Sequence, residues 1–251
     1  MKRFQDRVAL VTGGTSGIGK ATTLAFAAEG ARVVLAGRRE KEGAAVIADI
    51  RHHGGQGTFV ATDVTRDADV RALVASALKS YGRLDVAVNN AGTEGAMRPI
   101  TELDEEDWAR TVDVNMKGTW LSMKHEIPAM AERGGAIVNF ATIAALAGMP
   151  GTTIYSASKA GVIAMTRAAA IEWAGKGLRV NVVSPGAVET DMFERFTGGD
   201  EHAKAEFRAA HPLGRAASAA EIAEAVLWLA SDGAAFITGH NLVIDGGYTA
   251  R

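Results

Sequence analysis

The chain has 251 residues, and its 27 Lys and Arg against 29 Asp and Glu leave a formal net charge of −2. This near balance excludes the strongly basic composition typical of nucleic-acid binding, so we expect no nucleic-acid partner. The sequence has 0 cysteines, which excludes disulfides, thiolate metal sites and a cysteine nucleophile. A chain of this length can bury about three-quarters of its unfolded surface and needs no covalent staple.

Apolar runs are short everywhere in the chain. The run VALV near the N-terminus and the run that starts at Ala144 are too short for a signal-peptide core or a membrane span. We therefore expect a cytoplasmic protein that does not bind membranes. The six histidines show neither HxxxH nor HxH pairing, so we expect scattered surface or capping histidines and no metal site.

Apolar runs alternate with segments of helical period along the whole chain. The predicted strands are 7–11, 32–36, 58–62, 84–89, 136–141, 178–184 and 241–244. The predicted helical segments are 18–29, 40–53, 67–81, 105–133, 154–174 and 219–231. Repeated strand–helix alternation predicts an α/β fold: one Rossmann-like domain over residues 1–251, a doubly wound parallel sheet of seven strands with helices on both faces.

Residues 186–215 interrupt this alternation, with weak helical character and no strand. Long irregular insertions in compact domains are often lids over a site. We therefore expect a substrate-loop segment at about 187–215, with a merely variable surface loop as the alternative.

A glycine-rich stretch, TGGTSGIG, directly follows the first predicted strand and opens the first predicted helix. Glycines allow a tight turn and let backbone amides approach a pyrophosphate, and a helix N-terminus favours negative charge. Because the stretch lies in the first turn of a βαβ unit, it predicts a dinucleotide site. The residues assigned to that site are Gly13, Thr15, Ser16, Gly17, Ile18 and Gly19.

The second predicted strand, 32–36, is followed directly by Gly37, Arg38 and Arg39. An NAD site normally has a carboxylate near this point, which binds the adenosine ribose hydroxyls. Here Gly37 leaves room, and two guanidinium groups suit a 2′-phosphate. We expect NADP(H), bound by Arg38 and Arg39, with NAD(H) or a solvated arginine pair as the alternatives.

Tyr155 and Lys159 are four residues apart in YSASK, which places them on one face of a predicted helix. A tyrosine with a pKa near ~10 is a poor acid–base catalyst at neutral pH. A neighbouring ammonium stabilises the phenolate and lowers that pKa. Beside a dinucleotide site, this pair predicts hydride transfer coupled to proton transfer.

Four motifs occur in order along the chain: TGGTSGIG, NNAG at 89–92, YSASK, and SPG at 184–186. With them, essentially the whole chain resembles the short-chain dehydrogenase/reductase family. The resemblance implies that Tyr155 is the catalytic acid or base, that Lys159 binds the nicotinamide ribose, and that Asn115 holds a water in a proton relay.

The resemblance also implies cofactor contacts beyond the glycine turn. They are Asp63 near the adenine, Asn89 and Ala91 on the ribose side, Ile18, Pro185, Gly186, Val188 and Thr190 around the nicotinamide, and Val64, Gly92, Tyr155 and Lys159 as further contacts. Thr190 is expected to face the carboxamide.

At one position the chain departs from the family pattern. The family usually has a serine where this chain has Thr142, ahead of the tyrosine. Threonine keeps a hydroxyl that can bind a substrate oxygen, but it adds a methyl group and a stiffer χ1. We assign Thr142 to the catalytic set, with strand packing alone as the alternative.

The expected function is an NADP(H)-dependent oxidoreductase that interconverts a small-molecule carbonyl and a secondary alcohol. A β-ketoacyl-[acyl-carrier-protein] reductase and a sugar dehydrogenase are alternatives within the family. Reductases of the first kind commonly carry two basic residues that dock the acidic carrier protein. Here Arg133 is present at one of these positions, and Ile171 stands at the other. A non-catalytic NADP(H)-sensing regulator is the alternative from another class, although it would need only the nucleotide pocket. The candidate substrate pocket is mostly apolar and favours an uncharged substrate: Glu94, Ala144, Met149, Ile154, Phe193 and Phe196.

The helical segments 105–133 and 154–174 are apolar beyond one stripe. Their extra apolar positions need cover beyond a single sheet face. Family members commonly pair through these helices, so we expect a homo-oligomer, a homotetramer in preference to a dimer.

Overall fold

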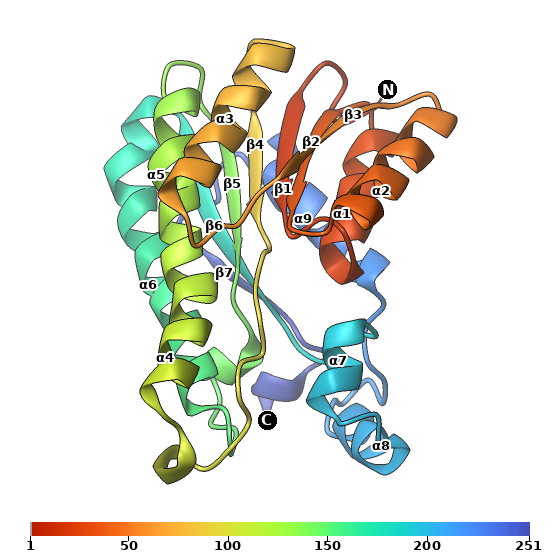
Figure 1. Ribbon diagram of the computed structural model, residues 1–251, viewed down its shortest axis with the longest axis vertical. Coiled ribbons are helices and arrows are strands. Elements are labelled where there is room, and N and C mark those ends of the chain that lie inside the picture. Colours follow the sequence, from red (N-terminus) through yellow and green to blue (C-terminus); the bar gives the residue numbers. More distant parts are fainter. Residues whose placement is uncertain (1) are drawn as a thin grey trace.

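Seven parallel strands form one sheet in the order β3-β2-β1-β4-β5-β6-β7 (Figure 1). The computed structural model describes residues 2–251. The strands are β1 (Val8–Thr12), β2 (Arg32–Gly37), β3 (Gln56–Ala61), β4 (Val86–Asn89), β5 (Gly135–Phe140), β6 (Leu178–Pro185) and β7 (Asn241–Ile244). The predicted doubly wound parallel sheet is confirmed, with small shifts at the strand ends.

Helices cover both faces of this sheet (Figure 1). One face packs against α1 (Gly17–Ala28), α2 (Glu40–His52) and α9 (Ala219–Ala230). The other face packs against α3 (Asp67–Tyr81), α5 (Gly118–Met130) and α6 (Thr153–Trp173). Because both faces are covered, every residue of β1 and β4 is buried. These two strands are neighbours at the point where the strand order reverses, which is where open α/β sheets bind ligands.

The segment 105–133, expected to be helical, has three parts. They are α4 (Glu105–Val112), a π-helical turn over Asp113–Lys117, and α5. Single π-helical turns inside α-helices occur frequently at functional sites. This turn contains Asn115.

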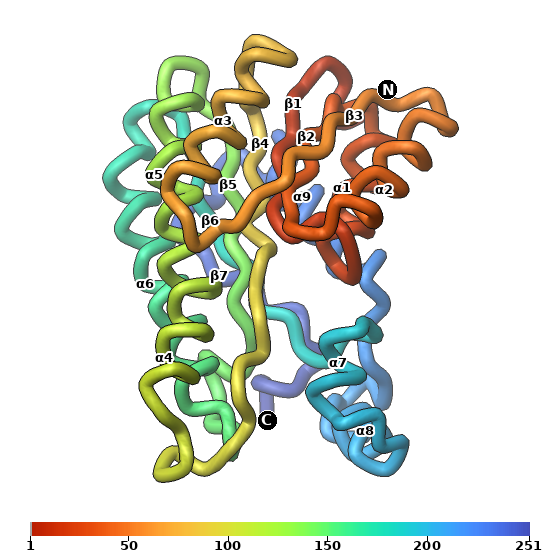
Figure 2. Tube along the Cα trace, viewed as in Figure 1, coloured from red at the N-terminus to blue at the C-terminus, as the bar shows by residue number. Residues whose placement is uncertain are grey.

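The expectation that residues 186–215 are irregular is wrong, because α7 (Asp191–Phe196) and α8 (Glu201–Ala209) form there. Both helices have side-chain caps at their N-termini. Thr190 Oγ1 accepts a hydrogen bond from the Phe193 amide, and the Asp200 carboxylate accepts from the amides of His202 and Ala203. Figure 2 shows the two helices beyond the carboxyl ends of the strands, near the C-terminus.

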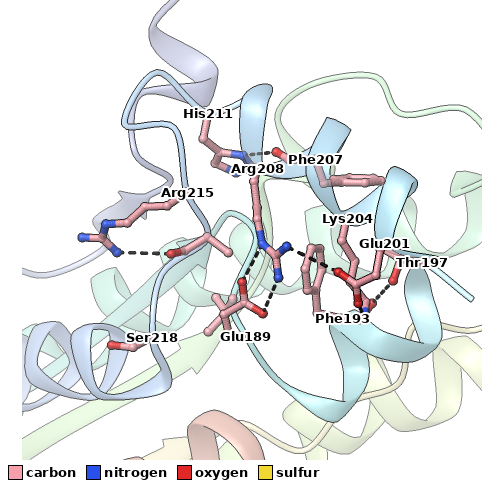
Figure 3. A network of polar contacts seen from close by, with 12 residues as sticks. Glu189, Phe193, Thr197, Glu201, Lys204, Phe207, Arg208, His211, Arg215 and Ser218 are labelled. Carbon is pink, nitrogen blue, oxygen red and sulfur yellow. Dashed lines mark hydrogen bonds and ion pairs between the residues drawn. The ribbon is translucent and has the colours of Figure 1, made fainter. Parts of the chain in front are cut away.

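Side-chain packing holds α7 and α8 together. The ring of Phe207 meets those of Phe193 and Phe196 edge to face, at centroid distances of 6.2 and 5.1 Å. Lys204 is 5% exposed and forms ion pairs with Glu194 and Glu201 (Figure 3). The aromatic contacts and the Lys204–Glu194 pair join residues 10 or more positions apart, so the sequence spacing of either helix does not reveal them.

A buried polar network lies between β4, β5, α5 and α6. Asn89 Nδ2 donates to Glu126 Oε2 at 2.9 Å and to Asn139 Oδ1 at 3.0 Å, and Asn139 Nδ2 donates to Thr166 Oγ1 at 2.9 Å. Burial raises the pKa of Glu126 to about 7, and the hydrogen bond from Asn89 opposes part of that rise. The carboxyl group is therefore protonated in the folded protein at pH values where it ionises in the unfolded chain.

Because its folded pKa is raised, Glu126 stabilises the fold most below its unfolded pKa, and this contribution is lost as the pH rises through about 7. We predict that the unfolding free energy of Glu126→Gln, relative to that of the wild type, increases by about 2 kcal/mol as the pH is raised from 5 to 8. Urea denaturation across this range measures the difference. Glu132→Gln, at an exposed position just beyond α5, is the control. A Glu126→Gln effect that does not change with pH would contradict the prediction.

Candidate functional site

A cavity of about 520 Å³ opens at the carboxyl ends of the strands, with α7 on one wall. It is lined by most of the residues that the sequence assigned to cofactor binding and catalysis. They are Gly13, Thr15, Ser16, Gly17, Ile18, Arg38, Arg39, Asp63, Val64, Ala91, Gly92, Thr142, Tyr155, Lys159, Pro185, Gly186, Val188 and Thr190. The topology thus brings loops from six strands to one place.

Three assigned residues, Gly19, Asn89 and Asn115, lie behind the cavity wall. A Cβ at Gly19 would lie 2.2 Å from the Gly13 carbonyl oxygen, so glycine is needed for α1 to pack against the turn. The sequence analysis expected the Asn89 side chain on the ribose side, and the structure corrects this. The side chain points into the core, toward Glu126 and Asn139. The neighbouring Asn90 lines the cavity instead.

The glycine turn is held against the end of β4. Gly13 has φ +66°, and a Cβ there would lie 2.8 Å from Ala91 Cα. Asn90 Nδ2 donates to the carbonyl oxygens of Thr12 and Gly13, both at 3.1 Å. Sequence reasoning missed this role of Asn90, although the second asparagine of NNAG was the signal for it.

The N-terminus of α1 faces the cavity and suits an anion. Its N-cap residue Ser16 makes no side-chain hydrogen bond to the helix amides, and the first turn contains no acidic residue. The free amides and the helix dipole therefore favour a negatively charged group here. Arg39 Nη2 donates to the hydroxyls of Thr15 and Ser16 at 3.0 and 2.5 Å and adds a positive charge. A pyrophosphate fits this chemistry.

Arg38 lies at the end of the cavity formed by β2 and β3. Within residues 2–251, no carboxylate lies within ion-pair distance of its guanidinium. Asp63 is close enough for the charge of Arg38 to act on it: burial would raise the pKa of Asp63, but hydrogen bonds from Thr65 and the positive charges of Arg38 and Arg66 hold it below its usual value. This end of the cavity therefore contains arginine side chains that could bind an anion. Position 37, near which an NAD site normally has a carboxylate, is a glycine.

Tyr155 and Thr142 meet at the other end of the cavity. Burial raises the pKa of Tyr155 to about 12; the neighbouring Thr142 hydroxyl opposes this rise, and the negative charge of Glu94 adds to it. Lys159 Nζ donates to the Phe140 carbonyl at 2.9 Å, and burial lowers its pKa to about 8. The expected lowering of the Tyr155 pKa by Lys159 is therefore not found: Lys159 is not among the groups that shift this pKa, and burial is the largest influence.

Asn115 connects three elements from its position in the π-helical turn. Its Oδ1 accepts from the Thr93 amide at 2.8 Å, and its Nδ2 donates to the Thr93 carbonyl at 2.9 Å and to Ser158 Oγ at 3.1 Å. The side chain thus ties the loop after β4 to α6, which carries Tyr155 and Lys159.

The wall beyond Tyr155 is mostly apolar, as the sequence predicted. Of the candidate pocket residues, Glu94, Ala144, Met149, Phe193 and Phe196 line the cavity, and Ile154 is buried outside it. Sequence reasoning missed the further lining residues Met192, Arg195 and Phe207. The run of aromatic residues within 187–215 was the available signal.

His211 lies close to Phe207 at the end of α8 (Figure 3). Its Nδ1 donates to the Phe207 carbonyl at 2.7 Å, and its Nε2 accepts from the Ala187 amide at 3.1 Å. The side chain is 2% exposed, so His211 is not a surface histidine, and its bond to a carbonyl in the last turn of α8 matches the capping role that was also expected. It joins the end of α8 to the loop after β6.

Within the described residues 2–251, no helix is long and apolar enough to cross a membrane. The same part of the chain contains no group of three or more His, Asp or Glu placed to hold a metal ion.

Comparison with known proteins places this geometry in a family. A family model described as Enoyl-(Acyl carrier protein) reductase matches residues 13–249. The chain is 40% identical over 252 residues to 2,5-dichloro-2,5-cyclohexadiene-1,4-diol dehydrogenase of Sphingobium indicum, covering 100% of both chains. It is 41% identical over 248 residues to 3-oxoacyl-[acyl-carrier-protein] reductase of Thermotoga maritima, covering 98% of both.

Among solved structures, levodione reductase is similar, with a TM-score of 0.96 and 34% identity over 99% of each chain. Sequence matches over the full length and a matching fold lead to one conclusion: the chain belongs to the short-chain dehydrogenase/reductase family of oxidoreductases, which act on alcohol and carbonyl groups.

Proposed function

We propose that this protein is an NADP(H)-dependent oxidoreductase that interconverts a cyclic secondary alcohol and its ketone. The observation that carries the proposal is a single cavity with an anion-binding turn and free Arg38 at one end, and Tyr155, Thr142 and Lys159 at the other. The Sphingobium relative, named for a cyclohexadiene diol, supports a ring substrate. So does the apolar wall beyond Tyr155.

NADP(H), when bound, supplies or accepts the hydride. The turn from Gly13 to Gly19 would hold the pyrophosphate, and Arg38 with Arg39 would hold the 2′-phosphate. The remaining contacts follow the loops along the cavity: Asp63 and Val64 for the adenine, Ala91 and Gly92 for the ribose side, and Ile18, Pro185, Gly186, Val188 and Thr190 for the nicotinamide. Because Thr190 Oγ1 already caps α7, a contact with the carboxamide would share that hydroxyl.

Tyr155 transfers the proton at the substrate oxygen in this proposal. Its pKa of about 12 keeps the phenol protonated at neutral pH, which is the form that donates a proton to a ketone oxygen. Thr142, which lies close enough to Tyr155 to act on its pKa, would orient the same oxygen. Lys159 and Asn115 are the residues assigned to the connection between the phenol and solvent.

The acyl-carrier-protein alternative has less support, although the Thermotoga relative is as similar in sequence. Ile171 is 83% exposed, so an acidic carrier would meet an apolar side chain where a second cation is needed. A sugar dehydrogenase would need a more polar wall than this cavity has. A non-catalytic sensor has no use for the joint placement of Tyr155, Thr142 and Lys159.

We also propose that the protein is a homotetramer. The α5 and α6 surface exposes Trp120 (49%) and Ile171 (83%) beside a shallow apolar groove. A second exposed apolar pair, Trp228 on α9 (41%) and Phe236 (105%), lies on the other side of the sheet. Two separate apolar surfaces suit two separate subunit contacts.

Turnover of cyclohexanone tests the function and the cofactor together. We predict a kcat/KM at least roughly tenfold higher with NADPH than with NADH, because one charged contact to the 2′-phosphate is at stake. Gly37→Asp with Arg38→Leu is expected to reverse the preference. The new Cβ would lie 3.0 Å from Thr15 Cγ2, so only that methyl group has to move slightly. A wild-type enzyme equally active with NADH would overturn the cofactor assignment.

Substitutions of Thr142 separate catalysis from packing. Thr142→Ser keeps the hydroxyl beside Tyr155 and is expected to retain kcat/KM within about tenfold, whereas the isosteric Thr142→Val is expected to lose roughly a hundredfold. NADPH affinity is expected to change little in both. If Val is tolerated better than Ser, the residue only packs.

Light scattering at micromolar concentration tests the oligomer. We predict a mass four times that of the 26.2 kDa chain, because both apolar surfaces are covered in a tetramer. A monomer would refute the proposal, and a dimer would leave only one of the two surfaces in use.

A further inference from the structure

An ion pair crosses the substrate end of the cavity. Glu94, in the loop after β4, accepts from Arg195 on α7: Nε lies 2.6 Å from Oε1, and Nη2 lies 3.2 Å from Oε2. Both side chains line the cavity. The Glu94 side chain is 15% exposed and the Arg195 side chain 58%, so Glu94 is the inner member and Arg195 the outer one.

Glu94 has unused acceptor capacity. A carboxylate offers about four lone-pair positions, and the two contacts from Arg195 occupy two of them. Among residues 2–251, Arg195 is the only hydrogen-bond donor to this carboxylate. Unused acceptor positions on a mostly buried carboxylate that lines a cavity suit a donor group on a bound ligand.

The surroundings of Glu94 define where that donor would be. The same cavity is also lined by Ala144, Met149, Phe193 and Phe196, which suit an apolar ring. The reacting oxygen in the proposed function lies at Tyr155 and Thr142, and the charge of Glu94 acts on Tyr155. A ring placed between them has its reacting carbon at one end and a second position facing Glu94.

Building on the proposed function, we propose that Glu94 and Arg195 determine specificity by binding a second, uncharged hydroxyl on the ring of the substrate. The hydroxyl donates to Glu94 and leaves the ion pair intact. An ammonium group at the same position meets the positive charge of Arg195, and a carboxylate meets the negative charge of Glu94. The pair therefore selects a neutral donor over either charge.

Four ring ketones test this selection: cyclohexanone, 4-hydroxycyclohexanone, 4-aminocyclohexanone and 4-oxocyclohexanecarboxylate. For each, kcat/KM is measured with NADPH, and Kd is measured by calorimetry on the enzyme with NADP⁺. We expect the wild type to prefer the hydroxylated ring over cyclohexanone by about tenfold in both quantities, because the hydrogen bond is to a charged acceptor. Both charged rings are expected to rank below the hydroxylated one.

Glu94→Gln removes the charge and keeps the shape. We expect the hydroxyl preference to fall by about tenfold and the carboxylate-bearing ring to gain about tenfold, since Arg195 loses its partner. Glu189→Gln is the matched control. It breaks the bidentate pair between Glu189 and Arg208 near α8, which lies outside the cavity lining (Figure 3), and it is expected to leave all ratios within about twofold.

Each outcome decides the question. Equal preference for all four rings in the wild type, or a Glu94→Gln effect of the same size on every ring, means that the pair only closes the cavity, and the inference fails. If the Kd ratios follow the expected order but no ring is turned over, the inference stands and the proposed function fails. If no ring binds, both fail.

Discussion

The close contact between the glycine turn and the end of β4 is the constraint on which the site depends. Gly13 packs so near to Ala91 that no Cβ fits, and Asn90 joins the two segments through the carbonyls of Thr12 and Gly13. This contact fixes the start of α1 at the point where the strand order reverses. The anion-binding amides and the loop that begins at Ala91 are positioned together as a result.

The same loop extends this order to the catalytic helix. Thr93 binds Asn115 through its amide and carbonyl, and Asn115 reaches Ser158 on α6. Tyr155 and Lys159 are on that helix, so hydrogen bonds and the short loop from Asn90 to Thr93 together link the turn to the helix that carries the proposed proton donor. The two ends of the cavity also differ in charge: one end has Arg38 with no ion-pair partner in the described part of the chain, and the other is mostly apolar and contains the ion pair of Glu94 and Arg195. This difference suits an anionic cofactor and a neutral substrate.

Strands buried on both faces appear in the sequence as continuous apolar runs, and glycine-rich turns appear as glycine clusters after them. For this reason the sheet and most residues that line the cavity could be predicted. Features that depend on distant contacts could not. The helices α7 and α8 rest on Phe207 and on the ion pairs of Lys204, and the spacing within 186–215 does not reveal these partners. Asn89 and Asn90 are adjacent, but Asn89 ends β4 with its side chain in the core, whereas Asn90 begins the following loop and lines the cavity. The pKa of Tyr155 follows from burial, which its spacing from Lys159 does not determine.

Removal of the Tyr155 hydroxyl tests most directly whether this cavity performs hydride transfer with Tyr155 as proton donor. The measurement is kcat for cyclohexanone with NADPH in Tyr155→Phe, together with the Kd of NADPH from its fluorescence. Tyrosine acting as the acid predicts a loss in kcat of about a thousandfold with a Kd within about threefold of the wild type. A variant that keeps kcat within about tenfold of the wild type would contradict that role.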